Sequence, residues 1–150
     1  LPRLAGGVGR VASFIVVALA LAIGCVGVAG SALHEQEDDW RGVAQHILAA
    51  ARSDDIVLFV PGWNEKPFAY YARGRVATEG DTPIPIAAEA VPALVTNVAA
   101  GRQRLWLVYA EGHYADPSGS LRTYLDGAYD VEQQQRFRDG ISVSLYNLGP

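Results

Sequence analysis

The chain has 150 residues, half of them hydrophobic, and a formal net charge of −4 at pH 7. All sixteen acidic side chains but only ten of the twelve Lys and Arg follow His34, so this part of the chain has a net charge of −6. It contains no basic stripe, which argues against nucleic acid as a partner. The single cysteine, Cys25, excludes an internal disulfide.

Residues 11–33 contain no charged side chain and predict a transmembrane helix. At about 1.5 Å per residue they reach roughly 34 Å, against about 30 Å of hydrocarbon in a bilayer. Arg3 and Arg10 precede the segment, so the bias of basic residues places the N-terminus in the cytoplasm. The predicted parts are a cytoplasmic flank (1–10), the transmembrane helix (11–33) and an extracytoplasmic domain (34–150).

Other interpretations of this segment stay open. A cleaved signal peptide would have a similar order of regions, with Gly30-Ser31-Ala32 as its cleavage site and a secreted domain after it. A lipoprotein signal ending at Cys25 fits less well, because the residues after Cys25 stay apolar. The glycine pattern of residues 7–12 imitates a dinucleotide-binding fingerprint but lacks a preceding strand. The chain starts with Leu1 and contains no Met, which predicts a piece of a longer protein.

The next segments predict alternating helices and buried strands. Apolar residues from Trp40 to Ala51 recur at helical spacing after Asp38 and Asp39, which can cap a helix. The continuous apolar run 56–60 predicts a central strand, and 61–67 a loop after it. Residues 68–72 predict a short helix.

The second half of the domain continues this alternation. Residues 84–86 predict a short extended piece at a sheet edge, 88–100 a helix and 105–109 a second buried strand. Residues 118–126 and 131–137 predict two further helices, and the alternating segment 141–146 an edge or one-sided strand. The order predicts a small α/β domain, Rossmann-like, around a mainly parallel sheet.

The segment 57–74 is the most informative part of the domain. It gathers aromatic and charged side chains at the carboxyl end of a predicted strand, where ligands bind in open α/β sheets. Such side chains suit sugars, phosphates and lipid headgroups. The predicted substrate-binding residues are Trp63, Glu65, Lys66, Tyr70, Tyr71 and Arg73. The alternative is that Phe68 and Tyr71 belong to the core and the charges only solvate the surface.

Two histidines differ in their expected roles. His46 lies opposite the apolar stripe of its helix and is expected at the surface. His113 follows a strand end beside Glu111 and Tyr114, where a role in a site is open because such loops often carry function. The sequence offers no catalytic set and no Cys and His at metal-ligand spacing, so neither catalytic nor metal-binding residues are predicted.

Residues 37–74, RLWLVYAEG (104–112) and FRDGISVSLYNLG (137–149) resemble the C-terminal region of bacterial membrane glycosyltransferases of the GT-C type. These polytopic enzymes are similar to dolichyl-phosphate-mannose–protein mannosyltransferases. The resemblance implies the bacterial cytoplasmic membrane, a polyprenyl-phosphate sugar as donor and no cofactor in this chain. It also implies further transmembrane helices of the same polypeptide, and the spacing of Ala20 and Gly24 agrees with helix packing.

The predicted function is therefore the C-terminal portion of a membrane glycosyltransferase that moves a sugar from a polyprenyl-phosphate carrier to an extracytoplasmic acceptor. The family's catalytic acid lies in an early loop that this chain lacks. This portion is thus expected to shape the substrate site and to be inactive alone. The alternative is a membrane-anchored or secreted α/β module that binds a ligand or partner without catalysis.

Overall fold

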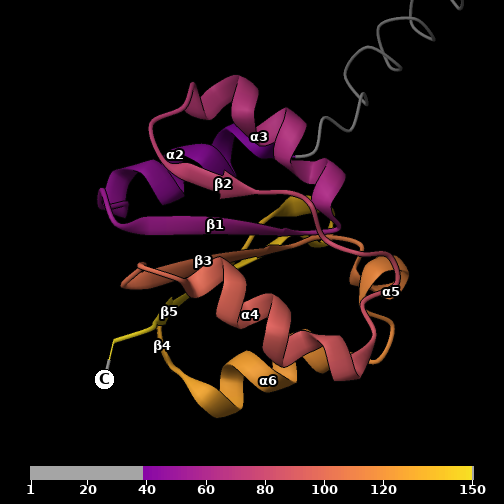
Figure 1. The fold of residues 1–150 in the computed structure, drawn as a ribbon. Coiled ribbons are helices and arrows are strands. Elements are labelled where there is room, and N and C mark those ends of the chain that lie inside the picture. The colour runs from indigo at the N-terminus through magenta and orange to yellow at the C-terminus, as the bar shows by residue number, and fades with distance from the viewer. Residues whose placement is uncertain (1–38, 150) are drawn as a thin grey trace, which may run out of the picture. The chain divides into compact units, whose positions relative to one another are not determined.

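The computed structural model describes residues 39–149, in which short helices alternate with five strands (Figure 1). The α-helices are α2 (Trp40–Ala50), α3 (Glu65–Ala72), α4 (Val91–Ala99), α5 (Gly112–Ala115) and α6 (Ser120–Ala128). The strands are β1 (Asp55–Val60), β2 (Ala77–Glu79), β3 (Arg104–Tyr109), β4 (Asp130–Arg136) and β5 (Ser142–Asn147). Three 3₁₀ turns complete the elements: η1 (Gly62–Asn64), η2 (Ala88–Ala90) and η3 (Arg138–Gly140).

The strands form one sheet in the order β2-β1-β3-β5-β4, and helices cover both of its faces (Figure 1). On one face α2 and α3 pack on a core that includes Val57, Phe59 and Trp106. On the other, α4, α5 and α6 pack on a core that includes Leu58 and Leu107. Because successive side chains of a strand point to opposite faces, the apolar runs of β1 and β3 supply both cores at once.

The predicted fold class, a transmembrane helix followed by a mainly parallel Rossmann-like domain, is wrong. The sheet is mixed: β1 pairs with β2 and β3 in parallel, whereas β5 pairs antiparallel with both β3 and β4. The chain turns back between β4 and β5 through η3, without a crossover helix. No helix within residues 39–149 is long and apolar enough to cross a bilayer, and the predicted span 11–33 lies outside the described residues.

Two assignments near the C-terminus are also wrong. Residues 131–137, predicted as a helix, contain most of β4, an edge strand whose seven residues are all exposed. Residues 141–146, predicted as an edge or one-sided strand, contain most of β5, which lies between β3 and β4 and is buried over Ser142–Tyr146. The polar residues of β5 are buried because the strand has a neighbour on each side, β3 and β4, and helices cover the faces of the sheet.

The remaining strong patterns are confirmed. The buried runs predicted β1 and β3, and the helical spacings predicted α2 and α4. Asp39 caps α2, since its Oδ1 accepts a hydrogen bond of 3.0 Å from the backbone N–H of Gly42. The strand β2 was missed, and the segment 84–86 is no strand.

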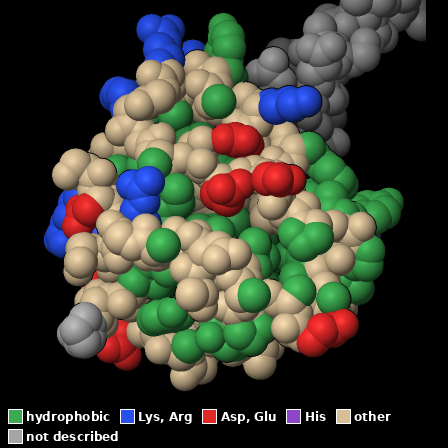
Figure 2. Space-filling view, viewed as in Figure 1, with side chains coloured by type: hydrophobic (Ala, Val, Ile, Leu, Met, Phe, Trp, Pro, Cys, Tyr) green, Lys and Arg blue, Asp and Glu red, His purple; other side chains and the backbone are tan. Residues whose placement is uncertain are grey.

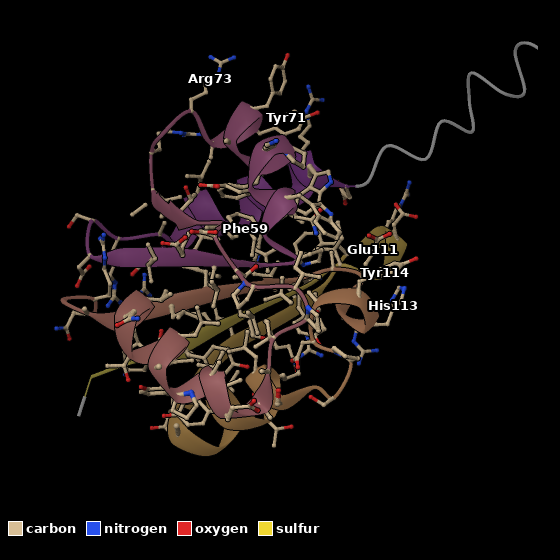
Figure 3. The ribbon with its side chains drawn as sticks, turned by 45° about the vertical axis from the view of Figure 1, so that its right-hand side comes forward. Phe59, Tyr71, Arg73, Glu111, His113 and Tyr114 are labelled. Carbon is tan, nitrogen blue, oxygen red and sulfur yellow. The ribbon has the colours of Figure 1, made fainter. Side chains whose placement is uncertain are left out.

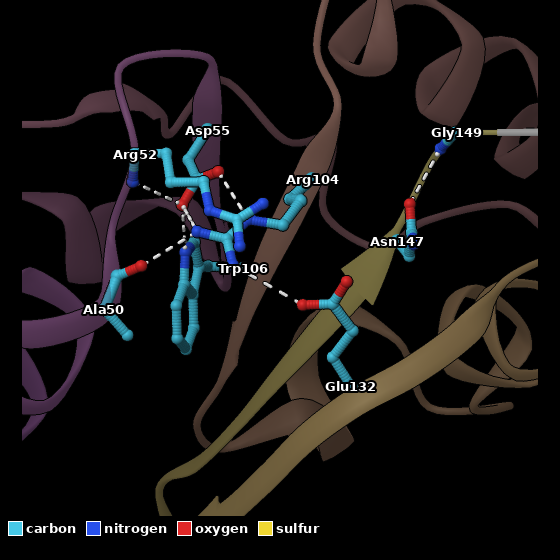
Figure 4. A network of polar contacts seen from close by, with 8 residues as sticks. All are labelled: Ala50, Arg52, Asp55, Arg104, Trp106, Glu132, Asn147 and Gly149. Carbon is cyan, nitrogen blue, oxygen red and sulfur yellow. Dashed lines mark hydrogen bonds and ion pairs between the residues drawn. The ribbon is translucent and has the colours of Figure 1, made fainter.

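At the amino end of the parallel strands, the buried carboxylate of Asp55 joins several elements (Figure 4). It accepts hydrogen bonds from Arg104 Nε (2.9 Å) and Nη2 (2.8 Å), from Trp106 Nε1 (2.8 Å) and from the backbone of Arg52 (3.0 Å). Arg104 also donates to the carbonyl of Ala50 at 2.8 Å and pairs with Glu132 at 3.4 Å. The network thus connects the end of α2 with β1, β3 and β4.

Candidate functional site

The loops that follow β1 and β3 lie at the carboxyl ends of the parallel strands, where open α/β folds bind ligands. From β1 the chain passes through α3 to β2 on one side, and then through α4 to β3 on the other side of β1. The carboxyl ends of β1 and β3 therefore flank a reversal of strand order, the usual position of a ligand site. The segments at this edge are η1 after β1 and α5 after β3.

A pocket of about 490 Å³ opens beside the carboxyl end of β3. Its walls come from the end of β3, α5, α6, the end of β4, η3 and the start of β5. The lining residues are Tyr109, Glu111, Gly112, His113, Arg122, Gln134, Arg136, Phe137, Asp139, Gly140, Ile141 and Ser142. This volume is in the range of small-molecule sites.

The Tyr109 ring forms one wall and is held from behind by Asp116. The Tyr109 hydroxyl donates to the backbone carbonyl of Asp116 at 3.1 Å and to its carboxylate at 3.2 Å. The same carboxylate accepts from the backbone N–H groups of Ser120 (2.8 Å) and Leu121 (3.1 Å) at the start of α6. Burial and the charge of Asp116 raise the pKa of Tyr109 to about 12, so its hydroxyl stays protonated at neutral pH.

Arg122 supplies the positive charge of the pocket. Its guanidinium lies over the Tyr109 ring, 4.3 Å from the ring centroid, and its Nη2 donates to Ser142 Oγ at 2.6 Å. Within residues 39–149 Arg122 makes no ion pair, and its buried Nε has no hydrogen-bond partner. A guanidinium fixed in this way keeps donors available for an anion.

The backbone next to Tyr109 is adapted to this arrangement. A Cβ atom at Gly112 would lie 1.8 Å from Tyr109 Cε1, so only glycine fits against the ring. Glu111 adopts a left-handed conformation (φ 49°), which is uncommon outside glycine and is often found at functional sites. The loop after β3 is thus shaped around Tyr109.

Further charged side chains border the pocket. Arg136 adds a positive charge, His113 contributes an exposed imidazole, and Glu111 and Asp139 contribute carboxylates. The His113 ring lies 4.2 Å from the Tyr114 ring, centroid to centroid. Figure 3 shows Glu111, His113 and Tyr114 together at one end of the sheet, away from Tyr71 and Arg73 on the α3 side.

The six residues predicted to bind substrate do not line this pocket. They are distributed from η1 to the residue after α3: Trp63, Glu65, Lys66, Tyr70, Tyr71 and Arg73. Glu65 is half-buried and accepts a hydrogen bond from Thr78 of β2. Figure 2 shows acidic side chains in the middle of the face that contains β2, with basic side chains toward its upper and left rim.

The aromatic residues of the predicted set have different environments. Trp63 is 48% exposed and Tyr70 is 75% exposed. Tyr71 is partly buried against the core, next to the fully buried Phe68, as the alternative interpretation expected. The Tyr70 and Tyr71 rings meet edge to face at 5.0 Å. Trp63 lies in η1 just before α3, and Tyr70 lies in the last turn of α3, so the helix separates them.

His46 is not the surface residue that its position in the sequence suggested. It is half-buried, with its ring 5.8 Å from Trp106 and 5.6 Å from Phe137, both in edge contacts. Its neighbours Trp106 and Phe137 come from β3 and from the residue after β4, so His46 is part of the packing between α2 and the sheet.

Sequence reasoning missed Tyr109, Arg122, Arg136 and Ser142. These residues come from β3, α6, β4 and β5, and only the antiparallel addition of β5 to β3 brings Ser142 beside Tyr109. The one signal in the sequence was the position of His113 and Glu111 directly after a buried strand. Both line the pocket.

The two arginines of the pocket can hold an anion, and the carboxylates of Glu111 and Asp139 border the same space. Arg122, Arg136 and His113 all line this space, and the Tyr109 ring borders it. Phosphate groups are recognised by such side chains. Comparison of the chain with protein-family models, curated proteins and solved structures gives no match.

Proposed function

We propose that this domain binds the phosphate end of a lipid-linked sugar and is the substrate-shaping part of a membrane glycosyltransferase. The observation that carries the proposal is Arg122, which lines the pocket with its guanidinium over Tyr109 and makes no ion pair within residues 39–149. The resemblance of residues 37–74, 104–112 and 137–149 to GT-C enzymes supplies the reaction class. In this proposal the glycosyl transfer takes place at the extracytoplasmic face of the membrane.

In this proposal the reaction is an inverting glycosyl transfer. An acceptor hydroxyl attacks the anomeric carbon of the sugar, the bond from that carbon to the phosphate oxygen breaks, and polyprenyl phosphate leaves. In the GT-C family that the chain resembles, the carboxylate that takes the acceptor proton as general base lies outside the segments of the resemblance. The residues described here bind and orient the phosphate, and none of them takes part in the chemical step.

The binding step is tested by titrating the chain with a short-chain polyprenyl phosphate, and with the corresponding alcohol as a control for the apolar tail. Arg122→Gln removes charge-assisted hydrogen bonds worth about 1.5–3 kcal/mol, so the Kd for the phosphate rises roughly 10- to 100-fold. Arg138→Gln is the matched control, because Arg138 is exposed and does not line the pocket. Equal affinity in the wild type and Arg122→Gln, or equal losses in both variants, would contradict phosphate binding at this pocket.

The transfer step is tested separately in membranes that hold the complete polypeptide, with a panel of polyprenyl-phosphate sugars. Arg122→Gln is expected to raise the KM for the donor and to leave kcat within about threefold, because it removes binding and no reacting group. If no sugar is transferred while the phosphate still binds, the glycosyltransferase assignment is lost and the non-catalytic binding module remains.

A further inference from the structure

The pocket beside Tyr109 contains two carboxylates that a phosphate cannot use. Glu111 and Asp139 line it together with Arg122 and Arg136, so the formal charges of its acidic and basic side chains cancel. An ionised carboxylate only accepts hydrogen bonds, and it repels a phosphate anion. A ligand that satisfies Glu111 and Asp139 therefore carries hydrogen-bond donors as well as a phosphate.

The backbone presents both carboxylates in a conformation that is uncommon outside glycine. Three non-glycine residues within 39–149 have a positive φ, and two of them are Glu111 (φ 49°) and Asp139 (φ 58°). Such residues persist where the surrounding structure fixes them, commonly at ligand sites. The turn with Asp139 is closed by a hydrogen bond of 2.8 Å from the N–H of Phe137 to the carbonyl of Ile141. The carboxylates thus belong to two separate walls, one after β3 and one between β4 and β5.

The pocket is also larger than a phosphate needs. At the roughly 30 Å³ that one water molecule occupies in the liquid, the five heavy atoms of a phosphate fill about 150 Å³. The pocket measures about 490 Å³, so more than half of it is left for the group that the phosphate carries. On the same scale the eleven heavy atoms of a hexosyl group add about 330 Å³, which this remainder accommodates.

The lining is suited to a polar headgroup and not to a lipid tail. Seven of its twelve residues have charged or polar side chains, and two are glycines. The other three, Tyr109, Phe137 and Ile141, are packed into or against the cores on the two faces of the sheet. The pocket therefore provides charges and hydrogen-bonding groups but no apolar groove for a polyprenyl chain.

We propose that the pocket recognises a glycosyl phosphate headgroup without its lipid, with the phosphate on Arg122 and Arg136 and the sugar hydroxyls on Glu111 and Asp139. A sugar ring carries several hydroxyl donors that point in different directions, which suits two acceptors on separate walls. The inference rests on the phosphate site of the proposed function and adds the sugar side of that site. Glu111 and Asp139 are then the residues that distinguish a sugar phosphate from other phosphates.

The test is calorimetric titration of the full chain with glucose, mannose and galactose 1-phosphate, and with methyl phosphate as the monoester that lacks hydroxyls. We expect at least one hexose 1-phosphate to bind roughly tenfold or more tightly than methyl phosphate, because ionised acceptors make strong hydrogen bonds. In the double variant Glu111→Gln/Asp139→Asn this preference should fall to about threefold or less. Both amides keep the shape of the side chain, and asparagine tolerates the left-handed conformation of residue 139.

The matched control is Glu89→Gln/Asp130→Asn, which removes the same charge from two exposed carboxylates outside the pocket. This variant should keep the preference of the wild type. A smaller preference in the wild type, or equal preferences in the two double variants, would overturn the inference. Tighter binding of phosphoethanolamine than of every hexose 1-phosphate would also overturn it, because the carboxylates would then bind an ammonium group.

Titration with the short-chain polyprenyl phosphate separates this inference from the proposed function. If the chain binds that ligand but shows no preference for a sugar phosphate, the role of Glu111 and Asp139 is lost and the phosphate site remains. If the chain binds none of the phosphates, both the inference and the proposed function are lost.

Discussion

The pocket depends on a close contact between the backbone of Gly112 and the Tyr109 ring. Tyr109 in turn supports the Arg122 guanidinium through the stacking contact and reaches Asp116 through its hydroxyl. A side chain at residue 112 would push the ring away from both partners. Glycine at residue 112 therefore helps to fix the position of Arg122, the arginine that we propose binds the phosphate.

Gly112→Ala is expected to destabilise the protein by about 1–3 kcal/mol, because the added Cβ would lie 1.8 Å from Tyr109 Cε1. The control is Gly127→Ala in α6, where a Cβ meets nothing within 4 Å. There the better helix propensity of alanine should add about 0.5–1 kcal/mol of stability. Urea unfolding measures both changes. Effects of the same sign would contradict the packing described around Tyr109.

At the scale of elements, the Asp55 network connects the start of β1 and β3 with α2 and β4 at the edge opposite the pocket. Burial alone would raise the pKa of Asp55. The hydrogen bonds from Arg104, the backbone of Arg52 and Trp106 together outweigh burial, and the pKa is lowered. A lowered pKa in the folded state means that the ionised carboxylate stabilises the fold.

Asp55→Asn leaves the buried Arg104 without its main partner and is expected to cost about 3–5 kcal/mol in the free energy of unfolding. In the wild type this contribution is fully present above the unfolded pKa of about 3.9, and it is lost as the pH falls through the lower folded value. The free energies of unfolding of the wild type and Asp55→Asn, measured between pH 7 and pH 2, should therefore converge as the pH falls.

Asp54→Asn provides the comparison for this element, since Asp54 is the neighbouring residue and makes no side-chain hydrogen bond or ion pair in residues 39–149. It should change stability by less than about 0.5 kcal/mol. A gap between wild type and Asp55→Asn that stays constant down to pH 2 would show that the carboxylate's charge is not the source of the stabilisation.

The elements that the sequence predicts well are those whose side chains are buried in a regular pattern. The runs of β1 and β3 and the apolar stripe of α2 belong to this group. The strand β4 could not be recognised, because an exposed edge strand has no apolar alternation and its Gln residues do not exclude a helix. The alternation of apolar and polar residues in 141–146 indicated an edge or one-sided strand, and the helix predicted over 131–137 left it without the second neighbour that β4 provides.

The candidate site could be predicted only in part for a related reason. His113 and Glu111 follow a recognisable strand, so their position next to a site was accessible from the chain order. Arg122 and Ser142 are twenty residues apart, and they meet at Tyr109 only through the antiparallel pairing of β3 with β5. The prediction of a mainly parallel sheet did not bring Ser142 next to Tyr109, so this pair was missed.

At the scale of the whole molecule, the amino and carboxyl ends of the parallel strands have separate roles. The amino end of β1 and β3 contains the paired Asp55 and Arg104, and the carboxyl end contains Arg122, which has no ion pair among the described residues. The segments that follow β1 and β3 at this end also expose Trp63 and Tyr114. Binding of a lipid-linked phosphate would use the carboxyl end alone and leave the amino end as the structural support.

The central claim is that Arg122 receives the phosphate, and the most direct measurement follows the side-chain N–H signals of the arginines by ¹⁵N NMR. The chain is titrated with a short-chain polyprenyl phosphate and, separately, with inorganic phosphate. We predict a saturable shift of the Arg122 Nε signal, a smaller shift for Arg136 and none for Arg104, which is bound to Asp55. An unchanged Arg122 signal, or equal shifts for Arg122, Arg104 and Arg138, would contradict the claim.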